Sequence, residues 1–315
     1  MSGTWELREL RERTRRAYLF ACALDVAVRK PGNVSAASAG HGMVAEQFIE
    51  SAVVSAEALT DLDAPVGRRI EGAIRATRAA VQCNTNLGIV LLCVPLAAAS
   101  EWMLRAATPE KRPGLLSGLR AVLAKLNIDD TRAAYRAIAL ANPGGLGAAS
   151  QQDVRDEPSI DLRAAMQLAS SRDRVARQYI NDFADVLELG LPAFAQFPSA
   201  PATGMLRAHF TFLASDVDSH IVRKHGAALA HSVTEDARRM LDAWRDSGQP
   251  PPSHALATWD EQLKLAGLNP GTSADLAVAS AFVAGMADPR FCDLSVPGLA
   301  WNVLNTRPTL TRLSG

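Results

Sequence analysis

Most of this 315-residue chain consists of long segments rich in Ala, Leu, Arg and Glu, which carry few of the signals that mark β-strands. Aromatic residues make up only 5% of the sequence, and alternation of apolar with polar residues is scarce. These residue types have high helix propensity, and apolar positions in the first 28 residues recur at three-, four- and seven-residue steps. The sequence therefore predicts an all-α fold.

Polar or proline-containing stretches divide the chain into segments of helical length. Two Pro/Ser-rich stretches, 196–204 and 247–254, separate segments of the same composition, so we interpret both as loops within one domain. We expect a single globular multi-helix domain over residues 1–315, with a central site built from loops. Its helices are expected over residues 4–28, 43–60, 66–82, 87–107, 115–126, 130–141, 160–189, 203–222, 233–246, 254–266 and 273–287.

Charge balance and cysteine spacing limit the class of protein. Lys+Arg and Asp+Glu number 33 each, so no net field attracts nucleic acid and we expect no such partner. The four cysteines form no CxxC pair, and the charged N-terminus lacks the apolar segment of a secretory signal, which together favour reduced thiols in the cytoplasm.

The longest apolar run, Leu87 to Ser100, is a candidate membrane segment that the sequence argues against. It is shorter than the roughly 20 residues of a membrane span and contains Pro95, so we interpret it as a core helix and expect no membrane partner. A homodimer is an open alternative, because the apolar pattern does not separate an exposed helix face from the core.

Four polar, glycine-bearing stretches interrupt the helical segments, and each is a candidate for ligand binding. The first contains Lys30, Gly32, Asn33 and His41 among small residues that let backbone N–H groups approach a phosphate. A plain connection with a helix-capping lysine explains this stretch equally well.

The second and third stretches also combine hydrogen-bonding residues with glycine. Asn84, Thr85 and Asn86 directly precede the most apolar helix, and capping of its N-terminus requires only one of them. The third stretch, NPGGLGAASQQD, starts at Asn142 and ends at Asp153. Its glycines are also consistent with a simple loop, and its aspartate with a solvated side chain.

The fourth stretch, NPGTSADL, places Thr272 three residues before Asp275, the spacing of a capping box at a helix N-terminus. Capping accounts for these two residues and leaves Asn269 and Ser273 for a ligand.

The densest group of ionisable residues is DVDSHIVRKH, residues 216–225. On a helix, Asp216, His220, Arg223 and Lys224 would lie along one side, whereas Asp218 would point elsewhere unless the helix is broken there. This mixture does not fit a closed zinc site, which needs four Cys or His ligands. It suits a nucleotide phosphate, with a carboxylate for Mg²⁺, and a solvated helix end is the alternative.

The order of these motifs resembles that of the triphosphoribosyl-dephospho-CoA synthase family, from about Ala17 to Met286. Members of that family carry a K-P-G loop, a histidine loop followed by F-x-x-S, a V-N-T-H-K-G motif, a G-x-R-G-E-A loop, a D-T-N-V segment and a closing N-P-G-G-S-A-D-L. The corresponding residues here are Lys30 to Gly32, His41 with Phe48 and Ser51, Cys83 to Gly88, Gly144 to Ala149, Asp218 to Ile221, and Asn269 to Leu276.

The chain departs from the family pattern at several charged positions. The family's His-Lys pair is Asn86-Leu87 here, and the Arg and Glu of its glycine loop are Leu146 and Ala148. The aspartate that follows the loop histidine has no counterpart, and D-T-N is D-S-H. The resemblance thus implies family and fold, and leaves the substrate open.

The resemblance implies an all-helical transferase of cofactor biosynthesis that takes a phosphorylated ribosyl group from ATP, with Mg²⁺, at a site where the four loops meet. Chemistry at an anomeric carbon needs phosphate binding, stabilisation of the leaving group and a base. The implied catalytic residues are Asp218, His220, His41 and Asp275, with the two histidines exchanging protons near neutral pH. Substrate would be bound by Lys30, Gly32, Asn33, Asn84, Thr85, Asn86, Arg223, Lys224, His225, Asn269 and Ser273, and metal by Asp216, Asp218 and Asp153.

Two alternatives to the family reaction stay open at this point. The chain could serve a C1-carrier or pterin-type cofactor pathway with another phosphorylated substrate, or it could be a non-catalytic helical ligand-binding module. A shared site also requires that Asn269, Ser273 and Asp275 face Asp218 and His220 across one cavity.

Overall fold

The chain folds into α-helices joined by loops, as the sequence predicted. The computed structural model describes residues 2–106, 113–147 and 151–293. Within these ranges there is no β-strand, and the only extended pairing is two isolated bridges, Ser35 with Ser38 and Gly40 with Met43. The prediction of an all-α fold is confirmed.

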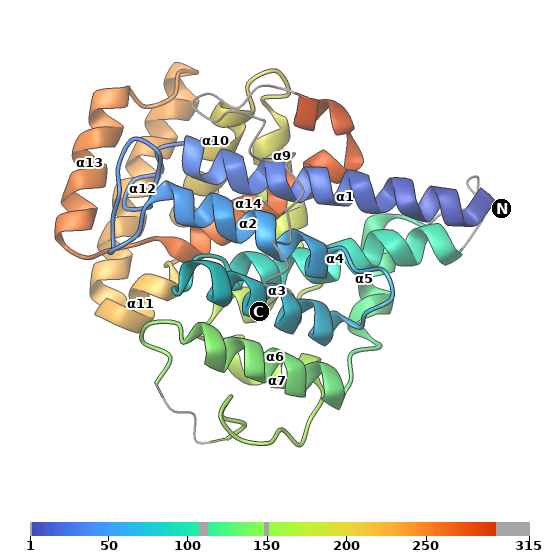
Figure 1. Cartoon of the computed structure of the whole chain (residues 1–315). Coiled ribbons are helices and arrows are strands. Elements are labelled where there is room, and N and C mark those ends of the chain that lie inside the picture. The colour runs from blue at the N-terminus through green and yellow to red at the C-terminus, as the bar shows by residue number, and fades with distance from the viewer. Residues whose placement is uncertain (1, 107–112, 148–150, 294–315) are drawn as a thin grey trace, which may run out of the picture.

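The helices in chain order are shown in Figure 1. They are α1 (Ser2–Ala27), α2 (Ala45–Leu59), α3 (Val66–Val81), α4 (Leu87–Ala106), α5 (Leu115–Leu123), α6 (Ile128–Ala141), α7 (Leu162–Ala169), α8 (Arg174–Gln178), the π-helix η2 (Asp185–Gly190), α9 (Leu191–Ala195), α10 (Pro201–Ser215), α11 (Ser219–His225), α12 (Ala227–Ser247), α13 (Ser253–Leu265), α14 (Gly271–Ala287) and the 3₁₀ turn η3 (Pro289–Asp293).

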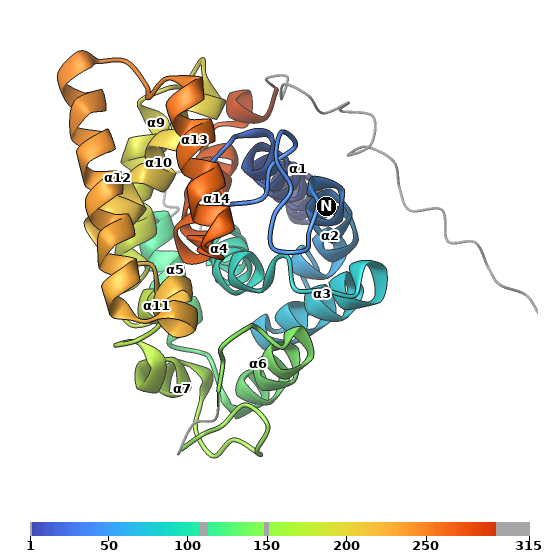
Figure 2. The same cartoon turned by 90° about the vertical axis from the view of Figure 1, so that its left-hand side faces the viewer.

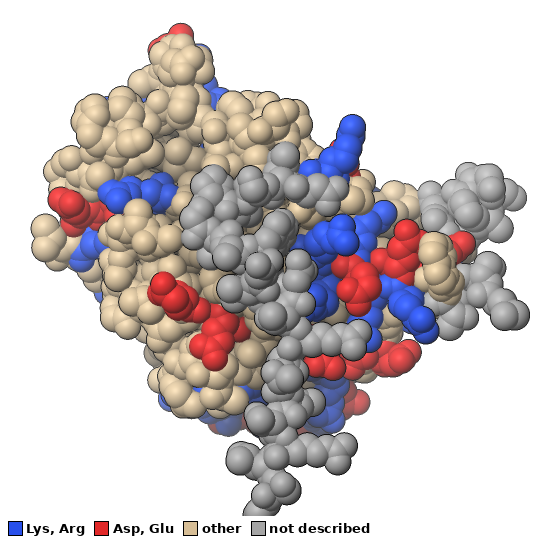
Figure 3. All heavy atoms as spheres, turned by 45° about the horizontal axis from the view of Figure 1, so that its top comes forward, with Lys and Arg blue, Asp and Glu red and all other residues tan. Residues whose placement is uncertain are grey.

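Helix α1 changes character along its length. Charged side chains gather over its N-terminal half, on the right of the face shown in Figure 3, whereas the segment from Ala17 to Val26 is buried. Tyr18 and Phe282 meet edge to face, with ring centroids 6.3 Å apart, where α1 packs against α14. One cluster of buried apolar side chains extends from this contact through helices on both sides of α14. Burial of this apolar surface is the main force that stabilises the fold.

Helix α4 is apolar and lies in the interior of the chain. By length and composition it could cross a membrane, but 67% of its most apolar window is buried inside the protein. It packs on α5, α14 and α3, and Figure 2 shows it near the middle of the view. The sequence therefore identified this core helix correctly, and Pro95 is accommodated within it.

Two long predicted helices are broken in the structure, at places where an aspartate caps a new helix. The segment expected as one helix over 160–189 contains α7, α8 and part of η2, and the side chain of Asp173 accepts hydrogen bonds from the first amides of α8. The helix expected over 203–222 stops at Ser215, because Asp216 is extended and Asp218 caps α11. Side-chain acceptors compete effectively with helix continuation at such positions.

Helix α14 starts earlier than the sequence predicted, and this changes the role of the fourth polar stretch. Pro270 is its N-cap, so Thr272 lies inside the first turn. The Thr272 hydroxyl contacts the hydroxyl of Ser219 at 2.9 Å, and the predicted capping box with Asp275 does not form. Asp275 therefore does not cap the helix.

Candidate functional site

A pocket of about 570 Å³ lies where the polar stretches meet. Its lining includes residues of the loop after α1, the start of α4, the described part of the third stretch, α7, α8, α11 and the start of α14. In Figure 2, α11 and α14 lie on one side of α4, and α2 and α3 lie on the other. The pocket thus joins segments far apart in the sequence, and its volume is typical of small-molecule and cofactor sites.

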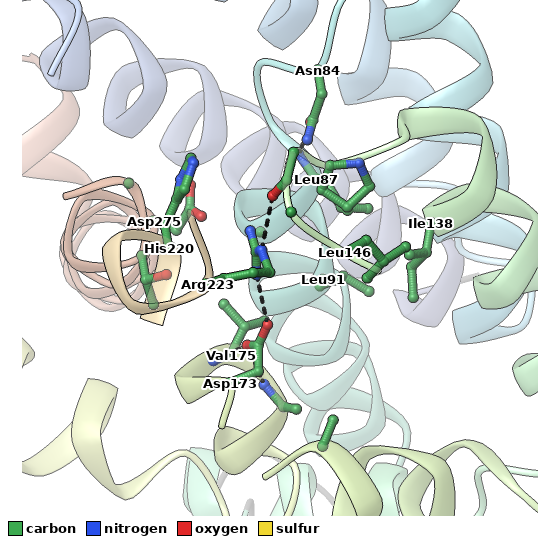
Figure 4. A pocket seen from close by; sticks show the side chains of 18 of the residues that line it. Asn84, Leu87, Leu91, Ile138, Leu146, Asp173, Val175, His220, Arg223 and Asp275 are labelled. Carbon is green, nitrogen blue, oxygen red and sulfur yellow. Dashed lines mark hydrogen bonds and ion pairs between the residues drawn. The ribbon is translucent and has the colours of Figure 1, made fainter. Parts of the chain in front are cut away.

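Cationic side chains gather on one side of the pocket. Arg223 donates hydrogen bonds to the Gly144 carbonyl at 3.0 Å and to Asp173 Oδ2 at 3.3 Å (Figure 4). Arg172 and Lys224 also line the pocket, and no hydrogen bond to the Lys224 ammonium occurs within the described residues. Three cations at one end of a pocket can bind an anionic group such as a phosphate chain.

The described part of the third stretch packs directly on these cations. A Cβ on Gly144 would lie 2.5 Å from Lys224 Cε, and Gly145 has a φ of +75°, which L residues rarely adopt. The positive φ of Gly145 and its approach to the Arg223 backbone favour glycine at that position, whereas the exposed Lys224 side chain can move away from a Cβ on Gly144. Residues 148–150, which include Ala148 and Ala149 of the corresponding family motif, lie outside the described residues.

His220 faces the same pocket, and its imidazole has lost the ability to titrate near neutrality. Burial lowers the pKa of His220 to about 3, with further lowering by Arg223 and Lys224. Its Nε2 is buried and has no hydrogen-bond partner in the part of the chain that the structure describes. The predicted proton exchange by His220 near neutral pH is therefore wrong, because the ring stays neutral there.

His41 lines the pocket from the first stretch, at a backbone φ of 55°. Its Nε2 contacts the Gly32 carbonyl oxygen at 2.8 Å. Burial lowers the pKa of His41, and the contact with Gly32 opposes this effect. The neutral ring is thus the favoured form of both pocket histidines at physiological pH.

Asp275 brings a carboxyl group without a partner into the pocket. It lies against Gly88 at the start of α4, where a Cβ would be only 2.0 Å from Asp275 Oδ2. Within the described residues this carboxyl makes no hydrogen bond, although it lines the pocket. Burial raises the pKa of Asp275 well above its usual range, and the neighbouring Asp25 raises it further. A carboxyl group in this state can hold and release a proton during a reaction.

The second stretch is held mainly by the protein itself. Asn84 accepts from the Leu87 amide at 3.2 Å, and the Thr85 hydroxyl donates to Ser51 at 2.6 Å. Asn86 Nδ2 donates to Thr77 at 3.0 Å, whereas its Oδ1 is buried without a partner. All three residues line the pocket, and among their buried side-chain atoms Asn86 Oδ1 is the one that remains available to a ligand.

An amide contact joins the first and fourth stretches at the pocket. Asn33 Nδ2 donates to Asn269 Oδ1 at 2.5 Å, and both residues line the pocket. Gly32 lies beneath them with its amide bonded to Asp260 at 2.9 Å, and it has no place in the pocket wall. Its positive φ and a backbone carbonyl 2.8 Å from any Cβ explain why glycine occurs there.

Lys30 does not bind substrate, contrary to the sequence-based hypothesis. Its side chain is fully buried and does not line the pocket. The ammonium contacts Asp25 Oδ1 at 3.0 Å and also donates to the backbone carbonyl of Asp25. A buried charge requires such a partner, and here the partner is a pocket residue.

Asp218 and Ser273 meet, as the shared-site hypothesis requires, but behind the pocket wall. Asp218 Oδ1 accepts from the amides of His220 and Ile221 at 2.9 and 3.2 Å, and Oδ2 accepts from the amide and hydroxyl of Ser273, both at 2.8 Å. Burial raises the pKa of Asp218, and these four donors oppose the rise. With both oxygens occupied, Asp218 joins α11 to α14 and is not available as a metal ligand or base.

The predicted metal ligands do not converge. Asp216 pairs with Arg177 at 2.9 Å outside the pocket, while Asp153 lines the pocket and pairs with Arg155 at 2.8 Å. Over residues 2–106, 113–147 and 151–293, no group of three or more His, Cys, Asp or Glu side chains could hold a metal ion. The described side chains alone therefore do not fit a resident Mg²⁺. His225, predicted to bind substrate, lies outside the pocket and contacts the Gly267 carbonyl at 3.0 Å.

Several pocket residues escaped the sequence analysis. Asp25 and Tyr135 lie within helices, where their spacing resembles that of any other helical residue. Asp173 and Arg172 follow α7 at the helix break that periodicity did not reveal. The one available signal was the S-S-R-D segment, whose Asp could have been identified as a helix cap.

Comparisons with known proteins show the family and the fold of the chain. The sequence matches the family described as ATP:dephospho-CoA triphosphoribosyl transferase over residues 11–290. No curated protein sequence is significantly similar to the chain. A crystal structure from Archaeoglobus fulgidus, of a protein provisionally assigned as a triphosphoribosyl-dephospho-CoA synthase, is 21% identical, with a TM-score of 0.60 over 76% of this chain and 98% of that one. At 21% identity, the similarity to the Archaeoglobus fulgidus structure shows a common fold.

Proposed function

Because the chain belongs to the ATP:dephospho-CoA triphosphoribosyl transferase family, and so is a transferase of prosthetic-group biosynthesis, we propose that its pocket transfers the triphosphoribosyl group of ATP to dephospho-CoA. In this reaction the bond between the anomeric carbon of ATP and its adenine breaks. A new bond forms between that carbon and a hydroxyl oxygen of the acceptor. The hydroxyl proton is balanced by the proton that the departing adenine takes up.

The observation that carries this proposal is the presence of cations and an unpaired carboxyl group in one pocket. Arg223, Lys224 and Arg172 lie on the side where a triphosphate would be attracted, and Asp275 lies beside the start of α4. A transfer at the anomeric carbon of ATP needs these two functions, a site for the phosphates and a proton donor for the leaving base. The charges of the pocket therefore match the donor.

Asp275 performs both proton transfers in this proposal. Its raised pKa keeps the carboxyl group protonated when the donor binds, so it can protonate the departing adenine. The carboxylate formed in this way then accepts the proton of the attacking hydroxyl, which restores the starting state. One half-buried carboxyl group thus closes the proton balance without a second base.

Neutral groups orient the sugar and the base. His220 Nε2 and Asn86 Oδ1 are buried polar atoms without partners among the described residues, so each gains a hydrogen bond when a ligand supplies one. Asn33, Asn84 and Asn269 complete this polar side of the pocket. Since His220 stays uncharged, it hydrogen-bonds the ligand without attracting the phosphates away from Arg223.

Magnesium enters this proposal as part of the MgATP substrate. A magnesium ion bound through phosphate oxygens needs only one or two carboxylates from the protein, so the lack of a three-residue metal group among the described residues does not conflict with it. The proposed location is the cytoplasm, where ATP is available and where the free cysteines of the described chain, Cys22, Cys83, Cys93 and Cys292, stay reduced.

The proposal is tested by incubating the purified protein with MgATP and dephospho-CoA and measuring free adenine. We expect adenine release that depends on both substrates, and a loss of about 10²- to 10⁴-fold in the rate for Asp275→Asn with ATP affinity retained. Leu140→Asn changes a surface side chain outside the pocket and serves as the control. Absence of adenine release by the wild-type protein would disprove the proposed reaction.

A further inference from the structure

The part of the pocket away from His220 and Asp275 is lined mainly by apolar side chains. Ile138 on α6 and Leu91 on α4 lie beside Leu146 of the third stretch, away from His220 and Asp275 (Figure 4). The other members of this apolar wall, as we call it, come from α4, α6, α7 and α8. They are Leu87, Tyr135, Leu162, Met166 and Val175.

The helices that carry the apolar wall hold its side chains in fixed positions relative to one another. Tyr135 and Ile138 are three residues apart on α6, and Leu162 and Met166 are four residues apart on α7, so each pair lies on one helix face. The Tyr135 hydroxyl donates to the Gln152 carbonyl at 2.9 Å, which leaves its ring as the part that faces apolar neighbours. A flat, uncharged group fits between such side chains.

Neither reacting group of the donor suits this wall. A triphosphate placed against these apolar side chains would lose hydration without gaining hydrogen bonds from them, which is costly. The donor ribose and its adenine must both lie close to Asp275, because Asp275 protonates the departing base. The wall is therefore left for a part of the acceptor, which must enter the same pocket because its hydroxyl reacts with the donor sugar.

We propose that the apolar wall is the acceptor subsite and that it holds the uncharged heteroaromatic ring of the acceptor. This inference rests on the proposed function. In dephospho-CoA the ribose hydroxyls belong to the sugar that carries the adenine ring, so the ring lies one sugar away from the new bond. Leu87 and Leu146 occupy positions where the corresponding family motifs have Lys and Arg, which is consistent with an uncharged group at this wall.

Equilibrium binding tests the subsite without relying on turnover. Isothermal titration with dephospho-CoA, ATP and 4′-phosphopantetheine, each alone, would compare the wild-type protein with Ile138→Asn and Leu146→Asn. Leu140→Asn is the matched control, because Leu140 is on the same helix as Ile138, is 37% exposed and does not line the pocket. Leu146 is 40% exposed, so its replacement tests the subsite even if Ile138→Asn impairs folding.

The expected result is dephospho-CoA binding weakened about tenfold by each wall variant, because a hydrophobic contact with the ring is lost. The affinities for ATP and 4′-phosphopantetheine, which should not depend on the wall, should change less than twofold. The control variant should bind all three ligands as the wild type does. Weaker ATP binding alone would assign the wall to the donor base, and equal weakening of 4′-phosphopantetheine would assign it to the acceptor arm. Each of these two results overturns the acceptor-subsite proposal. It is also overturned if the wall variants bind dephospho-CoA with unchanged affinity, or if the wild-type protein does not bind it. A wild-type protein that binds dephospho-CoA but releases no adenine would contradict the proposed reaction alone.

Discussion

The contact between Gly88 and Asp275 gives a sharp test of how the pocket positions its carboxyl group. Gly88 is the second residue of α4, and a Cβ at this position would lie 2.0 Å from Asp275 Oδ2, 2.6 Å from Cγ and 3.2 Å from Cβ. A carbon and an oxygen in ordinary contact are about 3.3 Å apart, so Gly88→Ala forces the carboxyl group to move by roughly 1.3 Å. Rotation of its terminal bond cannot remove all of these overlaps, because Cγ is involved.

Gly88→Ala should change the stability of the protein little and its activity strongly. Alanine is more favourable than glycine in a helix by about 1 kcal/mol, which offsets part of the cost of moving Asp275. Misplacement of a reacting group by about 1 Å costs about 100-fold in rate. We therefore expect Gly88→Ala to lower the rate of adenine release about 100-fold, while its midpoint of thermal unfolding stays within a few degrees of the wild type.

The assay compares initial rates of adenine release at saturating ATP and dephospho-CoA with thermal unfolding of the same preparations. Gly114→Ala is the matched control, because a Cβ on Gly114 meets no atom of the described residues within 4 Å and Gly114 does not line the pocket. If Gly88→Ala acts through Asp275, its effect should disappear in an Asp275→Ala background, since contacting residues are not additive. Wild-type activity in Gly88→Ala, or a full second loss in the double variant, would refute the reasoning.

Three further predictions concern the charges of the fold. Lys30→Met should lower the free energy of unfolding by about 3–5 kcal/mol in urea titrations, because Asp25 loses its buried partner, and should leave ATP affinity unchanged; a large loss of ATP affinity with normal stability would restore Lys30 as a ligand. Arg136 and then Arg75 lower the pKa of Glu71 to about 2, against the effect of burial, so its stabilisation is complete above its usual pKa and is lost as the pH falls towards 2. Urea midpoints measured between pH 6 and pH 3 should therefore fall more steeply for the wild type than for Glu71→Gln, and parallel curves would contradict this. Burial raises the pKa of Asp275, so native stability should decrease as the pH rises above the usual carboxyl range. Asp275→Asn removes that penalty, and it should raise the midpoint of thermal unfolding more at pH 8 than at pH 5; an equal change at both would count against it.

Helices with strong local signals could be predicted from the sequence, and those broken by tertiary contacts could not. Helix α4 was recognised from a nearly continuous apolar run, and α3 lies within one residue of the range predicted for it, 66–82. The break between α10 and α11 depends on Asp218 receiving two hydrogen bonds from Ser273, which is 55 residues away. Periodicity describes neighbours along one helix and contains no information about such a contact.

The same limit explains why the sequence assigned some charged side chains to the wrong place. Lys30 and Lys224 both appeared suited to phosphate, yet Lys30, which follows α1, is fully buried against Asp25, and Lys224, which lies within α11, is exposed at the pocket. The difference arises from how the loop after α1 folds back on itself, where the Ala36 amide bonds to the Val26 carbonyl at 2.7 Å. The order of the polar stretches along the chain allowed us to predict that they surround one pocket. Which side chain of each stretch faces that pocket depends on the fold.

Asp218 shows what this distinction means for experiments on the site. Its four hydrogen bonds hold the start of α11 against α14, and α11 carries both His220 and Arg223 into the pocket. Loss of Asp218 would therefore reduce activity as severely as loss of a catalytic group, although it touches no substrate. An activity screen alone would rank Asp218 and Asp275 together, whereas unfolding measurements would separate them. Removal of the buried Asp218 carboxylate, which accepts four hydrogen bonds, destabilises the protein, and removal of the half-buried Asp275 carboxyl group, which has no partner among the described residues, does not.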